Sequence, residues 1–171
     1  ADRKLIGSLV TAIQENEKVG AAYARQLPKS DCGFLEKYTR SFNYPSESCL
    51  KTEKDLATRG IKTYFCSNVC AAYDHKIYNE IGGFPEHAIF NEDMIYAGWM
   101  VKKGYGVAYV AEARVYHSHN YSCAQQFHRN FDLGVSQAEH PEIFEGVPSE
   151  GEGIRLVKKS MAYLTKTGHI W

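Results

Sequence analysis

The chain has 171 residues, enough for one domain with a sizeable core but not for two full domains. Its 20 Lys and Arg residues balance its 20 Asp and Glu residues, so no broad charge attracts nucleic acid, and we expect no nucleic-acid partner. The sequence shows no recognisable signal peptide and no apolar run long enough to cross a bilayer. We therefore expect a cytoplasmic protein, at most peripheral at the inner face of the cell membrane.

The five cysteines are odd in number, and none belongs to a Cys-x-x-Cys pair. This pattern indicates neither a disulfide framework nor a zinc finger, and it fits a reducing cytoplasm. Cys66 and Cys70 lie in an apolar stretch, where we expect buried structural thiols and not nucleophiles or metal ligands.

The first part of the chain alternates between helical and extended patterns. Residues 1–16 carry apolar side chains at helical spacing, and residues 18–27 are small and β-branched, as in a buried strand. Residues 34–42 again show a helical pattern. The run from 61 to 73 is rich in β-formers and predicts two strand segments joined by a turn or bulge.

The middle of the chain predicts two helices followed by two short strands. A helix over 76–81 should end at the glycines that follow it, because glycine adopts positive φ freely. A second helix begins near Glu92 and stops at Gly104. The strands are expected over 107–110 and 114–117.

Beyond Tyr121 the pattern becomes helical, with two apolar stripes. We expect both stripes to pack against the α/β core, with a membrane face or a partner chain as the alternative. The stripes consist of Ala124, Phe127, Phe131, Val135 and Ala138, and of Ile154, Val157, Met161 and Leu164.

Two neighbouring carboxylates stand out in the run Asn91-Glu92-Asp93. At a junction between loop and helix, the free N–H groups and the helix dipole favour ionised carboxylates, and an ionised carboxylate can act as a general base. Taken alone, the same run also fits an ordinary helix N-cap.

A pair of histidines closes the second predicted strand, in the run His117-Ser118-His119. If the strand continues through Ser118, alternation directs both imidazoles to one side, where they could bind a divalent cation. The alternative is a pair of ordinary surface histidines. A small His-x-His metalloenzyme is a further candidate, although such barrels are nearly all strand and the last third of this chain is helical.

Five motifs in register give these residues a context. They are Cys66-Ser67-Asn68-Val69-Cys70-Ala71-Ala72-Tyr73, Glu80-Ile81-Gly82-Gly83-Phe84-Pro85, Asn91-Glu92-Asp93-Met94, Lys103-Gly104-Tyr105 and Tyr109-Val110-Ala111-Glu112-Ala113-Arg114-Val115-Tyr116-His117. Together they resemble the distal half of family 2 glycosyltransferases with the GT-A fold. The run from Gln125 to Val135 is similar to the rhamnosyltransferase-like bacterial branch of that family.

The resemblance implies an α/β fold: a partial GT-A (nucleotide-diphospho-sugar transferase) fold with a mixed sheet, plus C-terminal helices. Residues 1–121 would form the acceptor-side half of the glycosyltransferase domain, and residues 122–171 a helical extension. Family members begin with a nucleotide-binding segment and an Asp-containing metal motif, which this sequence does not show. We therefore expect a fragment, inactive without that half, whose exposed apolar surface could pair with a second copy.

The resemblance also implies roles for individual residues. Asp93 matches the base that deprotonates the acceptor hydroxyl in an inverting transfer, and Glu92 its acidic neighbour. His117 matches a position that helps to hold Mn²⁺ or Mg²⁺ on the sugar diphosphate, and His119 is a second candidate. A divalent cation is thus expected in the full-length enzyme and not in this fragment.

Contacts with the donor and acceptor are expected from Gly82, Gly83 and Phe84, which resemble the family's loop before the acidic motif, although a helix stop is the alternative. Trp99 and Tyr96 could stack on the acceptor sugar or pack in the core. Arg25 and Gln26, which lie at the exit of a predicted strand, are further candidates for contact with the donor or acceptor.

The partners implied by the resemblance are a nucleotide-sugar donor, with rhamnose as a candidate sugar, and a glycan or polysaccharide precursor as acceptor. A non-catalytic carbohydrate-binding or assembly module remains the alternative to an enzyme.

Overall fold

The computed structural model describes residues 3–148 and 150–168 and contains a mixed four-stranded sheet. The strand order is β2 (Cys49–Lys51), β4 (Gly106–Tyr116), β1 (Val19–Leu27) and β3 (Ala71–Tyr73). The two long strands, β1 and β4, run parallel, and each has a short antiparallel neighbour. The predicted α/β class with a mixed sheet is confirmed.

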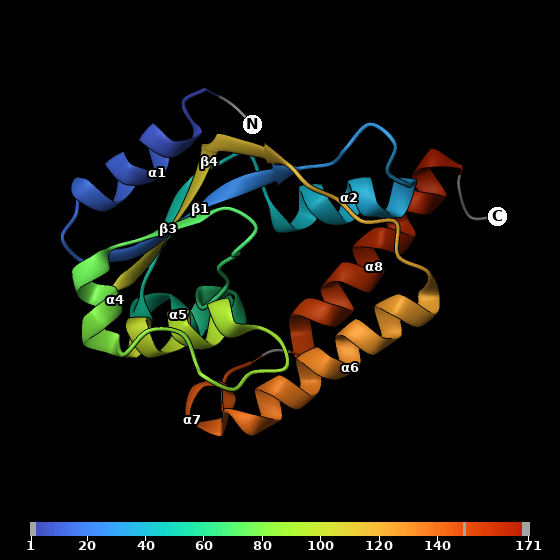
Figure 1. Cartoon of the computed structure of the whole chain (residues 1–171). Coiled ribbons are helices and arrows are strands. Elements are labelled where there is room, and N and C mark those ends of the chain that lie inside the picture. The colour runs from blue at the N-terminus through green and yellow to red at the C-terminus, as the bar shows by residue number, and fades with distance from the viewer. Residues whose placement is uncertain (1–2, 149, 169–171) are drawn as a thin grey trace.

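Helices cover both faces of this sheet (Figure 1). On one face, α1 (Leu5–Gln14) buries Leu9 against small residues of β1 and β4, including Ala22 and Ala108. The small side chains let the helix approach the sheet closely. The opposite face carries α4 (His75–Ile81) and α5 (Glu92–Lys102), and this side holds the larger core.

The larger core depends on α5, most of whose residues are buried. Ile95, Tyr96, Ala97, Met100 and Val101 are all 0% exposed. A helix that is apolar on all sides has to be enclosed on all sides. The short helix α7 (Pro141–Phe144) completes the enclosure by packing Ile143 against α5.

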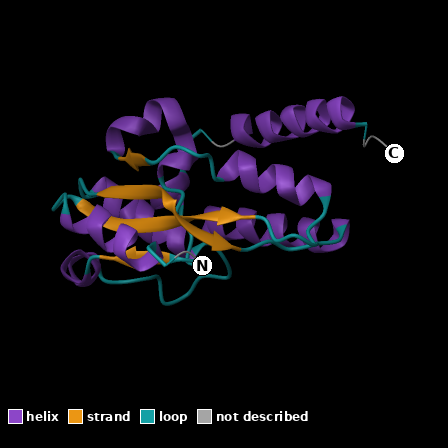
Figure 2. Ribbon diagram, turned by 90° about the horizontal axis from the view of Figure 1, so that it is seen from above, coloured by secondary structure: helices purple, strands orange, loops and turns teal. Residues whose placement is uncertain are grey.

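The remaining helices lie at one end of the sheet. The helix α2 (Phe34–Asn43) follows β1, and α8 (Glu150–Thr167) lies beside α2 in both views (Figures 1 and 2). Tyr163 of α8 stacks on Tyr38 of α2, with ring centroids 4.5 Å apart. The helix α6 (Cys123–Glu139) follows the histidine pair, and α3 (Leu56–Arg59) lies between two 3-10 turns, Glu53–Asp55 and Gly60–Thr63.

The prediction of two strand segments over residues 61–73 is wrong for most of that run. Only Ala71–Tyr73 is a strand, and the residues before it form a 3-10 turn and an irregular loop. Tyr64 and Cys66 are nonetheless buried, at 0% and 1% exposure. The apolar character of the run reflects burial of a loop, which periodicity does not distinguish from burial of a strand.

The two short strands predicted over 107–117 form one continuous strand. Their separation in sequence corresponds to an irregularity in β4, where Val110 pairs with Ala24 but Arg114 pairs with Arg25. Extra residues accommodated in this way bend a strand without ending it.

The prediction that the two C-terminal apolar stripes pack against the core is also wrong for their largest residues. Phe127 and Phe131 of α6 are 67% and 61% exposed, and Ile154, Val157 and Met161 of α8 are similarly open. The side of α8 that packs on α2 carries Tyr163 instead. Among the described residues, no helix is long and apolar enough to span a membrane.

Two glycines inside helices allow a test of the packing between α5 and α7. A Cβ at Gly98 of α5 would lie 2.4 Å from Cγ2 of the buried Ile143, whereas a Cβ at Gly134 of α6 would meet nothing within 4 Å. We expect Gly98→Ala to lower the free energy of unfolding by about 1 to 3 kcal/mol through overpacking. We expect Gly134→Ala to raise it by about 0.5 to 1 kcal/mol. Urea unfolding of the two variants measures both changes, and equal changes would contradict the packing described.

Candidate functional site

The acidic pair at the start of α5 is held by a single asparagine from the loop before β3. The backbone N–H of Asn68 donates to Oδ2 of Asp93 at 3.0 Å, and its side-chain Nδ2 donates to Oε1 of Glu92 at 2.9 Å. The other oxygen of Asp93, Oδ1, accepts from the backbone N–H of Met94 at 2.8 Å. Asn68 therefore fixes the direction of both carboxylates.

The environment of Asp93 makes its carboxylate more basic. Burial raises the pKa of Asp93, and the neighbouring carboxylate of Glu92 raises it further, while the N–H groups of Asn68 and Met94 act in the opposite direction. A carboxylate with a raised pKa binds a proton more readily than an exposed one. That property is needed in a general base.

The backbone just before the pair adopts an unusual conformation. Asn91 has φ of 72°, the left-handed region, which asparagine tolerates better than most residues. Its side chain makes no helix-cap hydrogen bond, and its buried Nδ2 has no partner among the described residues. The run is therefore not an ordinary N-cap built on Asn91. Strained backbone of this kind is common at functional sites.

Asn68 is itself positioned by an aromatic cluster. The hydroxyl of Tyr73 donates to Oδ1 of Asn68 at 2.6 Å, and the Tyr73 ring packs edge-on against Phe84 and Tyr96. Tyr96 is fully buried, so it packs in the core and does not stack on a substrate. Phe84 is half-buried in the same cluster.

A buried lysine holds the loop that leads to Asn68. Lys51 of β2 is 3% exposed, and its ammonium donates to the carbonyls of Lys62 and Phe65 and, at 3.1 Å, to the hydroxyl of Tyr23. It also lies over the ring of Tyr23, 4.6 Å from the centroid. Burial lowers the pKa of Lys51 to about 8.

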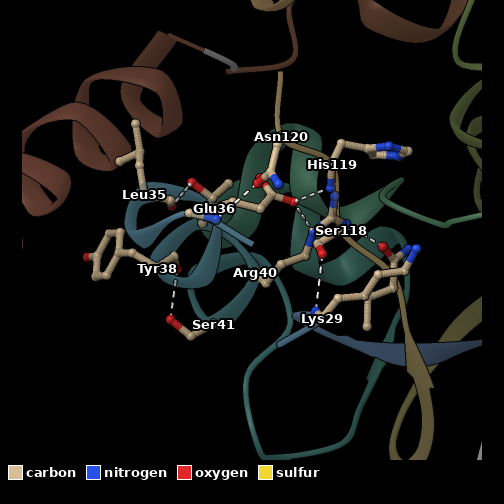
Figure 3. A network of polar contacts seen from close by, with 12 residues as sticks. Lys29, Leu35, Glu36, Tyr38, Arg40, Ser41, Ser118, His119 and Asn120 are labelled. Atoms are coloured by element: carbon tan, nitrogen blue, oxygen red, sulfur yellow. Dashed lines mark hydrogen bonds and ion pairs between the residues drawn. The ribbon is translucent and has the colours of Figure 1, made fainter. Parts of the chain in front are cut away.

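A series of hydrogen bonds connects this loop to the histidine segment. Gln26, 2% exposed, donates to Oγ of Ser67 at 2.7 Å and accepts from Arg40. Arg40 pairs with Glu36 at 2.7 Å, one turn earlier on α2. Glu36 in turn accepts a hydrogen bond from the backbone N–H of His119 at 3.3 Å (Figure 3).

The end of the histidine segment is attached to the start of α2. Oγ of Ser118 accepts from the backbone N–H of Lys29 (Figure 3). Oδ1 of Asn120 accepts from the backbone N–H of Gly33. The structure thus links the histidine segment to Asn68 and the acidic pair through α2 and Gln26.

The two histidines lie against each other, with ring centroids 4.4 Å apart. Burial lowers the pKa of both; the neighbouring His119 adds to the effect on His117, and Arg40 adds to the effect on each. Neutral imidazoles are the form that binds a metal ion. Among the described residues, no group of three or more His, Cys, Asp and Glu side chains could hold a metal.

The residues expected to contact donor or acceptor lie in two other places. Trp99 lines a groove of about 590 Å³ together with Gly82 and Phe84. Trp99 is six residues after Asp93, about 9 Å along the α5 axis. Arg25 donates from Nε to the backbone carbonyl of Tyr44 at 3.2 Å and is half-buried.

Gly82 and Gly83 end α4, with φ of 101° and 81° and with both backbone N–H groups bonded to the carbonyl of Tyr78. The helix stop considered for them is therefore present.

Sequence reasoning missed Lys51, Arg40 and Glu36 as parts of the site. The spacing of Glu36 and Arg40, four residues apart in a predicted helix, was a detectable sign of an ion pair. Nothing in the local pattern around Lys51 marked it as buried.

The prediction of buried thiols holds for one of the two cysteines concerned. Cys66 is buried, and burial raises its pKa to about 11, whereas Cys70 is only half-buried. All five are free thiols.

The fold and the site are consistent with part of an α/β glycosyltransferase-like fold that presents an acidic pair. The chain is 43% identical over 165 residues to the O-antigen chain rhamnosyltransferase WbaN of Salmonella anatum, covering 95% of this chain and 52% of that protein. It is 44% identical over 174 residues to the O-antigen chain rhamnosyltransferase RfbN of Salmonella typhimurium, covering 100% of this chain and 54% of that protein. No family model and no solved structure matches.

These similarities establish a sequence relationship to glycosyltransferases along essentially the whole chain. The chain spans about half the length of the relatives it matches.

The raised pKa of Asp93 predicts that its carboxylate lowers stability at neutral pH. When the pKa of a group is higher in the folded state than in the unfolded state, ionisation of that group lowers the free energy of unfolding. The loss disappears at a pH where the group is protonated in both states. We expect Asp93→Asn to melt at a higher temperature than the unaltered chain at pH 7. Differential scanning calorimetry should show this gain shrink as the pH falls from the raised pKa of Asp93 towards the usual range of aspartate, and vanish below that range.

The control is Asp31→Asn, which alters an exposed carboxylate and should leave the melting temperature unchanged. A lower melting temperature for Asp93→Asn at pH 7 would contradict the assignment of an energetically costly carboxylate.

The lowered pKa of Lys51 predicts a second pH dependence. Between pH 8 and 10.5, the unfolded chain holds a proton on Lys51 that the folded chain releases, so stability gains from rising pH. Over that window the free energy of unfolding should rise by about 3 kcal/mol relative to Lys51→Met. Urea unfolding of both proteins at several pH values measures the difference. Lys54→Met, at an exposed lysine, should show no such divergence, and parallel profiles for all three proteins would refute the prediction.

Proposed function

We propose that this chain forms the acceptor-side part of a GT-A, family 2-like inverting glycosyltransferase, in which Asp93 is the general base. The observation that carries the proposal is the acidic pair held by Asn68, with its raised pKa at Asp93. The sequence relationship to two O-antigen chain rhamnosyltransferases supports a nucleotide-sugar donor, with rhamnose as the sugar, and a bacterial O-antigen glycan as the acceptor. A cytoplasmic location at the membrane surface fits that substrate class.

The chemistry follows from the contacts of Asp93. A sugar hydroxyl is a weak nucleophile, and a carboxylate within hydrogen-bond reach can take its proton as the oxygen attacks the anomeric carbon and the bond from that carbon to the donor's diphosphate breaks, releasing the nucleoside diphosphate. Asn68 and Met94 occupy one hydrogen-bond position on each Asp93 oxygen. A carboxylate has about four such positions, so an acceptor hydroxyl still has room to bind. Glu92, held by the same asparagine, keeps the pKa of Asp93 raised.

A divalent cation would bind at His117 and His119 in this proposal. A neutral imidazole nitrogen can supply one ligand to Mn²⁺ or Mg²⁺, cations that are otherwise bound mainly by oxygen atoms such as those of a diphosphate, and the bound cation would neutralise charge on the leaving group. The remaining ligands would come from the diphosphate and from an Asp-containing motif in the nucleotide-binding half. The two-ligand histidine pair in the described part of the chain fits this division better than a freestanding His-x-His metalloenzyme.

A chimera tests the proposal. The matching half of the Salmonella typhimurium relative would be replaced by this chain, and transfer of rhamnose from its nucleotide donor would be measured. Asp93→Asn should lower kcat by about 10² to 10⁴-fold and leave donor binding nearly unchanged, because the base contacts the acceptor. A carbohydrate-binding module without chemistry would instead bind glycan regardless of Asp93.

The control is Glu139→Gln, an exposed carboxylate at the end of α6, which should retain full activity. Full turnover by the Asp93→Asn chimera, or an inactive chimera before any substitution, would overturn the proposal.

A further inference from the structure

Arg129 connects the histidine pair to the segment that precedes the acidic pair. Arg129 of α6 places its guanidinium over two rings, 4.8 Å from the centroid of Phe90 and 4.8 Å from that of Tyr121. Tyr121 in turn stacks on His119, with centroids 4.7 Å apart and planes at 21°. The result is a continuous row of packed groups from His117 to Phe90.

The row ends next to the acidic pair. Phe90 is three residues before Asp93, so the two lie within about 11 Å along the chain. The carbonyl of Phe90 accepts a hydrogen bond from Ser136, a fully buried residue of α6. Ser136 and Arg129 therefore both attach α6 to the segment that carries the base.

The two ring contacts hold the Arg129 guanidinium in place but do not use its hydrogen-bonding groups. The N–H donors of a guanidinium lie in its plane, so a cation–π contact leaves them available to a further partner. Within residues 3–148 and 150–168, no hydrogen bond or ion pair is made by the Arg129 guanidinium, in contrast to Arg40, which pairs with Glu36 and Gln26. Arg129 is half-buried. It is thus a partly desolvated cation, held against two rings, without an anionic partner among the described residues.

The surroundings of the row are also positive. Burial is the main cause of the lowered pKa of His117 and His119, but Arg40 and Lys29 contribute at both, and Arg129 contributes at His119. Glu36 is an opposing carboxylate that acts on both histidines, and it is already paired with Arg40. A bound anion would relieve this accumulation of positive charge.

We propose that Arg129 is a phosphate-binding residue, holding a phosphate or diphosphate group through its in-plane N–H donors beside His119 and Tyr121. The planar fork of arginine matches two phosphate oxygens, and such paired, charge-assisted hydrogen bonds are among the strongest in proteins. The inference goes beyond the proposed transfer reaction, because it holds whether or not Asp93 is a base.

Two sources share this chemistry: the diphosphate of a soluble sugar nucleotide, and the phosphate head groups of a lipid surface. The exposed Phe127 and Phe131 lie on the same helix as Arg129, so a lipid source has to be tested alongside the soluble one.

Titration calorimetry of the 171-residue chain with inorganic pyrophosphate, in the presence of a chelator, tests the proposal without any metal. Arg129→Gln should weaken pyrophosphate binding about 10 to 100-fold, the effect of losing hydrogen bonds to a charged group. Arg129→Lys keeps the positive charge but loses the planar pair of N–H donors, so its affinity for pyrophosphate should lie between those of the unaltered chain and of Arg129→Gln. The measurement involves no sugar transfer, so its outcome does not depend on whether Asp93 is a base, which separates this test from that of the transfer reaction.

The matched control is Arg114→Gln, which removes the same charge from an exposed arginine of β4 and should leave binding unchanged. A parallel sedimentation assay uses phosphatidylglycerol vesicles. Vesicle binding that requires Arg129 and is displaced by pyrophosphate would assign the site to lipid phosphate, whereas pyrophosphate binding without vesicle binding would assign it to a soluble diphosphate. Absence of pyrophosphate binding, or equal weakening by Arg129→Gln and Arg114→Gln, would overturn the proposal.

Discussion

The contact between Asn68 and the two carboxylates is the interaction on which the site depends. One residue binds Asp93 through its backbone and Glu92 through its side chain, so two like charges are held side by side in a partly buried place. Ionised groups in such a place are costly unless their hydrogen bonds are fixed. Tyr73 fixes the asparagine amide, and Lys51 fixes the loop before it. The larger core, on which Tyr73 packs, therefore contributes to the position of the Asn68 side chain.

The same constraint explains why the polar groups of the site form one connected set. Buried polar atoms require partners, and Gln26, which is almost fully buried, finds them in Ser67 and Arg40. Arg40 then requires Glu36, and Glu36 also accepts from the backbone of His119. The histidine pair at the end of β4 and the acidic pair at the start of α5 are thereby fixed relative to each other by hydrogen bonds through α2.

Much of this architecture was predictable. The helices over 5–14, 34–43, 75–81 and 92–102, and the long buried strand over 19–27, follow from apolar periodicity and glycine positions. The run over 61–73 was not predictable, because a buried loop and a buried strand have the same apolar composition. The C-terminal stripes misled for a related reason: periodicity identifies an apolar face but not whether anything covers it, and Phe127 and Phe131 remain exposed.

The sequence by itself determined the two candidate groups, Glu92 with Asp93 and His117 with His119, through residue type and local spacing, and its resemblance to a known family implied the class of fold. Only the tertiary structure decided which residues serve them. Asn68 is 25 residues from Asp93 in the sequence, and Lys51 is 14 residues from Phe65. Arg129 of α6 contacts the ring of Phe90, which lies just before α5. Contacts at such separations depend on how strands and helices pack, and the pKa values of Asp93 and Lys51 depend on the burial that this packing creates.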